Sequence, residues 1–363
     1  MTGPYLVPYK GVVPNLGARA KIATDAALIG QVTLGDDAIL GPLVTLRADG
    51  HRNDIGHTCQ FLDRATVHVA DGLLPAVVGH RVTVGRYALV HACTIDDDCL
   101  LCDGAVVMDG SHIGAGAVIA AGALVPPGKT LEGGMLYAGN PAKPVREISA
   151  TERETLRDAL IKGRQDDAVL ACDLPPLTMS PFRAETTGAE PLLSLANAAP
   201  EINPAAYVAP NSLVAGAVSV AEHASVWFAT VVRAFGAPIR VGARSNIQDN
   251  SILLTKPGSG ALVIGEDVTL GHNVRMSACT VGNGCLIGMG CEVMEGVVVE
   301  DGAMVGARAL VEPGTVVKAG YIWAGRPARE FRPVKTEERT FFGRGKEVYV
   351  GYAGAYLEET TAA

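Results

Sequence analysis

The 363-residue sequence predicts an all-β fold of two tandem parallel β-helix domains, each followed by a C-terminal α-helix. Three observations predict it. Aliphatic residues return with a period of six, and the whole pattern repeats after 186 residues. The chain also contains 43 glycines while aromatic residues make up only 5%. Such a composition suits a repeat fold with many tight corners.

The short period is clearest from residue 95 onward. Every sixth residue is aliphatic, and a small residue stands two positions before each aliphatic one. The aliphatic positions are Ile95, Leu101, Val107, Ile113, Ile119 and Val125, and the small ones are Cys93, Cys99, Ala105, Ser111, Ala117 and Ala123. A period of six is neither the 3.6 of an amphipathic helix nor the 2 of a half-buried strand. It indicates a parallel β-helix, in which three six-residue units make one triangular coil.

The long period indicates a duplication. Without any insertion, VTVGRYALVHACTI (82–95) matches VTLGHNVRMSACTV (268–281), and YAGNPAKPVRE (137–147) matches WAGRPAREFRP (323–333). The predicted domains are therefore a first β-helix over residues 1–148 and a second over 199–335, which we call lobe 1 and lobe 2.

Three further segments complete the chain. Ser149 and Glu152 have the spacing of a capping box, which predicts a helix over residues 149–172. Residues 173–198 are rich in Pro, Thr and Ala and are interpreted as a linker. Residues 336–363 are predicted to form a C-terminal helical tail, interrupted by Gly-Arg-Gly at 343–345.

Charge and hydropathy exclude several classes of function. The net charge is −8, the pI is about 5.5, and no run of Lys or Arg is present, which argues against nucleic-acid binding. No stretch has the roughly 18–20 uninterrupted apolar residues of a membrane span. The N-terminus shows no secretory leader, so we expect a cytoplasmic protein with reduced cysteines. Its partners are then expected to be a small-molecule substrate and copies of itself, with no nucleic acid and no membrane.

Most cysteines follow the repeat. Six of the eight occupy the small inward position, where Cys acts as a small hydrophobic residue: Cys59, Cys93, Cys99, Cys279, Cys285 and Cys291. Cys99 and Cys102 form a Cys-x-x-Cys pair, but metal binding by such pairs needs a second one.

Two histidines of lobe 1 are expected to stack. His68 and His91 each directly follow an inward residue, at the same corner of successive coils. Strand spacing then brings them about 4.7–4.9 Å apart along the prism. Lobe 2 has Leu254 and Ser277 at these positions.

A second corner has the opposite pattern. There lobe 2 keeps His272, with Gln248 and Asn246 nearby. At the positions of His272 and Gln248, lobe 1 has Arg86 and Leu62. Each lobe therefore lacks the histidines that the other keeps.

The sequence resembles the gamma-class carbonic anhydrase family over almost all of both lobes. The resemblance lies in VGARSNIQDNS (241–251), VTLGHNV (268–274), CLIGMG (285–290) and AGNPAK (138–143). It implies that the β-helices are left-handed and that lobes group in threes. It also implies a zinc ion held by three histidines, two from one subunit and one from its neighbour.

Carried over residue by residue, the resemblance assigns the two same-subunit ligands to His68 and His91. The neighbour's ligand matches His272. A glutamine that supports the metal-bound water matches Gln248, and an asparagine matches Asn246. An Arg–Asp pair near the interface matches Arg47 and Asp49, which lobe 2 replaces by Arg233 and Phe235.

These assignments predict one composite site, with the metal ligands His68, His91 and His272 and the catalytic residues Gln248, Asn246 and Arg47. The expected cofactor is Zn²⁺, with Fe²⁺ or Co²⁺ as alternatives, and the expected reaction is attack of metal-bound hydroxide on CO2. Proton relay in the family uses glutamates beside the metal, whereas the loop 69–78 is apolar apart from Asp71. A zinc hydrolase or lyase for a thioester, lactone or amide therefore remains an alternative. So do a metal-free scaffold and a hexapeptide acyltransferase. The resemblance also predicts a homo-oligomer with trimer-like packing of lobes.

Overall fold

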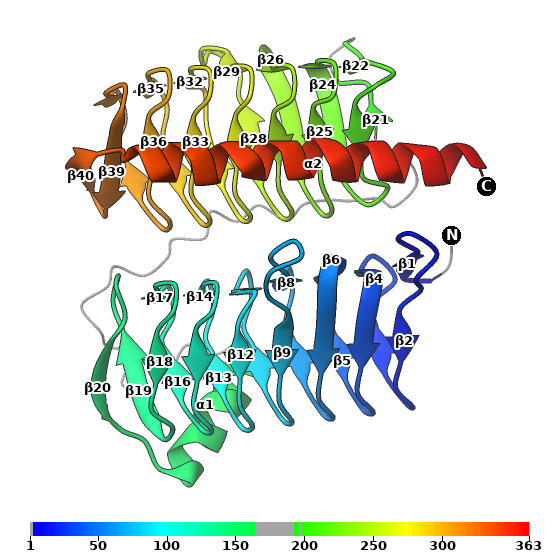
Figure 1. Ribbon diagram of the computed structural model, residues 1–363, viewed down its shortest axis with the longest axis vertical. Coiled ribbons are helices and arrows are strands. Elements are labelled where there is room, and N and C mark those ends of the chain that lie inside the picture. The colour runs from blue at the N-terminus through cyan, green and yellow to red at the C-terminus, as the bar shows by residue number, and fades with distance from the viewer. Residues whose placement is uncertain (1–2, 164–191, 196–197, 363) are drawn as a thin grey trace. The chain divides into compact units, whose positions relative to one another are not determined.

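The computed structural model describes residues 3–163, 192–195 and 198–362. The chain divides into two compact units, Met1–Arg183 and Ala184–Ala363. Each is a left-handed parallel β-helix with a helix on its surface (Figure 1), which confirms the predicted fold class. Neither described helix has the length and hydropathy needed to cross a bilayer.

In the first unit, parallel pairs from residue 60 onward join strands that lie three apart in the chain, so that each coil contributes three strands. The larger sheet has 12 described strands. They are β1 (Tyr5–Val7), β2 (Asn15–Leu16), β4 (Ala27–Leu34), β6 (Thr45–Ile55), β8 (Thr66–His68), β9 (Ala76–Val78), β11 (Leu89–His91), β12 (Thr94–Ile95), β14 (Val106–Val107), β15 (His112–Ile113), β17 (Leu124–Val125) and β18 (Thr130–Leu131). The smaller sheet comprises β3 (Lys21–Ile22), β5 (Ile39–Leu40), β7 (Gln60–Phe61), β10 (Thr83–Val84), β13 (Leu100–Leu101), β16 (Val118–Ile119), β19 (Met135–Ala138) and β20 (Lys143–Glu147).

The larger sheet covers two faces of the prism because its long strands turn a corner. The first residues of β6 pair with β8, and its last residues pair with β9. The corners are tight. At Gly85, an added Cβ would lie 2.6 Å from the backbone nitrogen of Asp103 in the next coil, so that only glycine fits there.

The second unit repeats this arrangement. Its larger sheet comprises β21 (Leu192–Leu193), β22 (Glu201–Ile202), β24 (Leu213–Val220), β26 (Val231–Val241), β28 (Ile252–Thr255), β29 (Leu262–Ile264), β31 (Arg275–Met276), β32 (Thr280–Val281), β34 (Glu292–Val293), β35 (Val298–Val299), β37 (Leu310–Val311) and β38 (Val316–Val317). Its smaller sheet comprises β23 (Tyr207–Val208), β25 (Ser225–Val226), β27 (Asn246–Ile247), β30 (Thr269–Leu270), β33 (Leu286–Ile287), β36 (Met304–Val305), β39 (Tyr321–Gly325) and β40 (Ala328–Pro333).

The predicted inward residues fill both cores. Val67, Val84 and Val90 are fully buried, and the six cysteines expected at inward positions all belong to the cores. Burial raises the pKa of the Cys99 thiol to about 12, and its sulfur contacts the carbonyl of Gly114. These cysteines are therefore protonated packing residues at neutral pH.

The first helix, α1 (Ala150–Lys162), is shorter than predicted. Ser149 is its N-cap and accepts a hydrogen bond from the backbone of Glu152, as the capping box predicts. The prediction that this helix continues to residue 172 is wrong. Gly163 takes a left-handed conformation, which ends the helix at Lys162. Residues 164–172 lie outside the described part of the chain.

The predicted C-terminal boundary of the linker, residue 198, is wrong. Leu192 and Leu193 form β21, which pairs in parallel with β24 and so belongs to the second β-helix. Residues 173–191, the greater part of the predicted linker, lie outside the described residues.

The second helix, α2 (Thr336–Ala362), runs along the second unit (Figure 1). The predicted interruption at residues 343–345 is wrong, because the helix continues through Gly343 and Gly345. Beyond them, Tyr349 and Tyr356 pack against Trp227, with ring centroids 5.3 and 5.6 Å away. This aromatic packing offsets the low helix propensity of two glycines, which costs about 1 kcal/mol each.

Candidate metal centre

His68 and His91 are the last residues of neighbouring strands in the first unit. They end β8 and β11, and the parallel register pairs one directly with the other, as their spacing predicts. Because successive side chains of a strand point to opposite faces, the inward Val67 and Val90 force both imidazoles outward. Both are nevertheless buried.

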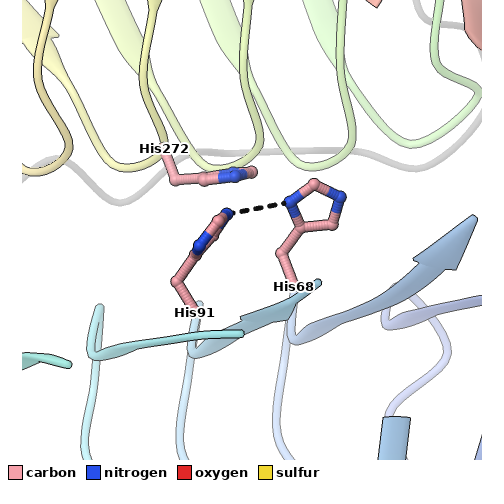
Figure 2. Close-up of side chains that lie close together, drawn as sticks. All are labelled: His68, His91 and His272. Carbon is pink, nitrogen blue, oxygen red and sulfur yellow. Dashed lines mark hydrogen bonds between the residues drawn. The ribbon is translucent and has the colours of Figure 1, made fainter. Parts of the chain in front are cut away.

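The two imidazoles present nitrogen atoms to each other. Nδ1 of His68 lies 3.3 Å from Nε2 of His91, the contact drawn as a dashed line in Figure 2. The ring centroids are 5.2 Å apart, and the planes are inclined at 64°. A hydrogen bond at this distance would require a proton on one of the two nitrogens, whereas a shared cation would require a lone pair on both.

The outer nitrogen of His68 faces a buried ion pair. Its Nε2 lies 3.3 Å from Oδ1 of Asp49, while Arg47 Nε donates a 2.5 Å hydrogen bond to Oδ2 of Asp49. Burial raises the pKa of Asp49, but the Arg47 guanidinium and His68 outweigh it and the pKa lies below its usual value. Burial also lowers the pKa of His68, which favours its neutral, metal-binding form.

The outer nitrogen of His91 faces a second carboxylate. Nδ1 of His91 lies 2.6 Å from Oδ1 of Asp109, in the turn that follows β14. Burial opposes ionisation of Asp109, yet the proximity of His91 brings its pKa below the usual range. The Asp109 carboxylate is therefore ionised at neutral pH and accepts a hydrogen bond from Nδ1–H of His91.

In the second unit, His272 also lies beside a carboxylate. Its Nδ1 is 3.0 Å from Oδ2 of Asp249, and both side chains are fully buried. The other oxygen of Asp249 accepts a 3.0 Å hydrogen bond from the backbone nitrogen of Phe228. His272, which Figure 2 also labels, therefore has Nδ1 on the side of the Asp249 carboxylate.

Gln248 and Asn246 form a short chain of amides on the same unit. Gln248 Nε2 donates to Asn246 Oδ1 at 3.1 Å, and Asn246 Nδ2 donates to the hydroxyl of Thr269 at 3.1 Å. Gln248 Oε1 is buried and has no hydrogen-bond partner among the described residues. A buried acceptor of this kind is costly unless something else satisfies it.

The equivalent corner of the first unit has a structural use. Leu62, at the position of Gln248, packs against an apolar cluster that includes Leu156 and Leu160 of α1. Arg86, at the position of His272, donates a 3.0 Å hydrogen bond to the carbonyl of Leu160. This corner therefore holds α1 in place.

The second unit has no ligand atoms at the positions of His68 and His91. Leu254 and Ser277 are half-buried there. Arg233 is exposed and stands over the ring of Phe235, 5.7 Å from its centroid, where the first unit has the buried Arg47 and Asp49. Each unit thus carries part of a histidine set on a different corner.

Sequence reasoning missed Asp109. Its signal was nonetheless present, because Asp109 follows His91 by 18 residues, the length of one coil of three six-residue units. Asp249 accepts a backbone N–H bond and also faces His272.

Comparisons with known proteins agree with this architecture. Residues 278–313 match the bacterial transferase hexapeptide family (six repeats), and residues 261–293 match the hexapeptide repeat of succinyl-transferase. The protein is therefore a hexapeptide-repeat protein.

Similar proteins define the family more closely. Gamma carbonic anhydrase 3 of Arabidopsis thaliana, a mitochondrial protein, is 40% identical over 49% of this chain and 71% of its own. Protein YrdA of Escherichia coli is 40% identical over 42% of this chain and 86% of its own. Uncharacterized transferase YtoA of Bacillus subtilis is 46% identical over 44% of this chain and 95% of its own.

A solved hexapeptide transferase family protein from Anaplasma phagocytophilum is 37% identical over 46% of this chain and 98% of its own, with a TM-score of 0.43. From the sequence matches, the chain belongs to the gamma carbonic anhydrase-like family of hexapeptide-repeat proteins.

Proposed function

We propose that this protein is a metal-dependent hydratase or hydrolase of the carbonic anhydrase type, with one site that uses His68, His91 and His272. The observation that carries the proposal is the contact between His68 Nδ1 and His91 Nε2 at 3.3 Å. Two nitrogen ligands about 2.0–2.1 Å from a tetrahedral zinc ion would be about 3.3 Å apart. The separation of these two nitrogens therefore suits one shared cation.

The donor set supports a catalytic metal. In each of the three imidazoles, one nitrogen lies beside a carboxylate, which leaves the other as a neutral donor. Three nitrogen donors with an open fourth position are typical of catalytic zinc sites, whereas structural sites use four protein ligands. Zn²⁺ is the metal that we expect, with Fe²⁺ or Co²⁺ as alternatives.

The remaining site residues would position a nucleophile and the ligands. A zinc ion in such a site lowers the pKa of a bound water to about 7. Gln248 Oε1, the buried acceptor without a partner, would accept a hydrogen bond from that water and orient it. Asn246 holds the Gln248 amide in this orientation. Arg47 would act indirectly, because it fixes Asp49, which in turn faces His68.

Carbon dioxide is the substrate that we propose first, with bicarbonate as the product. A specific observation also favours an organic substrate. The loop after His68 has Leu73 66% exposed and Leu74 37% exposed. Leu74 lies over Gly110, directly beside Asp109. Exposed apolar side chains near the site would suit the acyl part of a thioester or ester.

Metal content of full-length variants tests the proposed site. We expect His91→Ala and His272→Ala each to lose the bound metal, because two nitrogens hold a divalent ion far more weakly than three. The repeat supplies matched controls 186 positions away, Ser277→Ala and Arg86→Ala, which should retain it. Equal metal content in His272→Ala and Arg86→Ala would contradict the composite site.

Activity assays distinguish the two substrates. The zinc-loaded protein should hydrate CO2, and this activity should disappear in His91→Ala. Hydrolysis of thioesters or esters without CO2 hydration would favour the second substrate class. A protein that binds no metal after zinc addition would instead be a scaffold.

A further inference from the structure

All three histidines of the proposed site have one feature in common, and each finds it within its own unit. The nitrogen that would not bind metal lies beside an aspartate. The pairs are His68 with Asp49 at 3.3 Å, His91 with Asp109 at 2.6 Å and His272 with Asp249 at 3.0 Å. A carboxylate in this position fixes the tautomer and the orientation of an imidazole ligand.

Two of these aspartates also make contacts that stabilise the fold. Asp49 forms the buried ion pair with Arg47, and Asp249 accepts the backbone N–H of Phe228. Removing either would disturb the β-helix itself. Asp109 is different, because within the described residues the hydrogen bond to His91 is the one that its side chain makes with another side chain.

The contact determines which nitrogen of His91 is available. An ionised carboxylate only accepts hydrogen bonds, so the contact requires a proton on Nδ1 of His91. Neutral His91 then has its lone pair on Nε2, the nitrogen that faces His68. Without Asp109, both the other tautomer and other ring orientations become accessible.

We propose that Asp109 is a positioning residue for the metal centre, which holds His91 in the tautomer and orientation that bind metal. This inference rests on the proposed function, since it assigns a role to Asp109 only if His91 is a ligand. Asp109 would act through His91 and would itself touch neither the metal nor the substrate.

The second unit supplies the matched control. Glu295 stands 186 positions after Asp109, but Ser277 takes the place of His91 there. Glu295 instead lies 3.2 Å from Lys256 at the surface. Removing its charge should change nothing at the metal centre.

The test measures zinc affinity of the full-length chain by competition with a chromophoric chelator. We expect Asp109→Ala to bind zinc about 10–100-fold more weakly than the unchanged chain. Asp109→Asn keeps a neutral acceptor oxygen, so its zinc affinity should lie between those of Asp109→Ala and the unchanged chain. The zinc affinity of Glu295→Gln should equal that of the unchanged chain. Nitrogen-15 NMR of metal-free Asp109→Asn should show a smaller population of the Nδ1–H tautomer of His91, a signal that a purely structural role would not move.

Two outcomes overturn the inference in different ways. If Asp109→Ala and Asp109→Asn bind zinc as the unchanged chain does while His91→Ala does not, Asp109 has no positioning role and the proposed function stands. If His91→Ala also keeps full zinc affinity, the proposed function fails and the role of Asp109 fails with it. Should Asp109→Ala not fold, the Asp109→Asn affinity and its tautomer signal decide alone.

Discussion

Asn53 is a polar side chain in the interior of the first β-helix. It is fully buried in β6, in register with Val32 and Ala76, and neither atom of its amide has a hydrogen-bond partner among the described residues. The equivalent residue of the second unit is Ile239, also fully buried. A buried amide without partners costs about 1–3 kcal/mol, so this position weakens the first unit relative to the second.

We therefore predict that Asn53→Val raises the free energy of unfolding by about 1–3 kcal/mol. The reciprocal change, Ile239→Asn, should lower it by at least as much, because it adds a buried amide and removes apolar packing. Urea unfolding with an unchanged m-value measures both. A loss of stability in Asn53→Val would mean that an internal water satisfies the amide.

At the scale of elements, the helices differ in how the β-helices hold them. Both begin with the same ion pair to the preceding hairpin, Arg146 with Glu152 at 2.5 Å and Arg332 with Glu338 at 2.6 Å. They end differently. In α1, the Arg86 guanidinium binds the Leu160 carbonyl near the C-terminus, where a helix favours positive charge. In the second unit the equivalent residue is His272, and α2 instead continues over Trp227.

We predict that Arg86→Ala loosens the end of α1 and leaves metal content unchanged. The free energy of unfolding should fall by about 1 kcal/mol or less, since Arg86 is partly exposed and its contacts are screened. Hydrogen exchange of the last amides of α1 should accelerate, and the amides near its N-cap should not change. Loss of metal from this variant would assign Arg86 to the site instead.

At the scale of the whole molecule, the two units carry complementary parts of one histidine set. The first has two of the histidines and Leu62 at the position of Gln248, and the second has the third histidine and Gln248. Under the proposed function, a set divided in this way would yield at most one complete site for each pair of lobes, and fewer if the lobes group in threes. A two-lobe chain in which each lobe kept all its ligands would instead yield two sites per chain.

We therefore predict that the purified full-length protein saturates at no more than one zinc ion per chain. Elemental analysis together with zinc titration measures this number, and native mass spectrometry gives the number of chains in the assembly. A value of two would indicate a second site outside His68, His91 and His272. A value below one at saturation would indicate that some lobes remain unpaired.

The sequence by itself determined the repeat, the inward positions and the register of His68 with His91. These follow from the six-residue period, because a regular backbone places equivalent residues at the same corner of every coil. It also determined that each lobe lacks part of the histidine set, since the lobes can be compared position by position.

Only the tertiary structure decided which neighbour each outward side chain uses. The contact of Asp109 with His91 and that of Arg86 with the end of α1 depend on side-chain orientation and on where a helix packs. So does the lack of a hydrogen-bond partner for Gln248 Oε1 within the described part of the chain. The C-terminal end of α1 at Gly163 and the continuity of α2, which packs against Trp227, were likewise decided only by the structure. Periodicity constrains the backbone, whereas the partner of each outward side chain depends on its orientation and on where a helix packs.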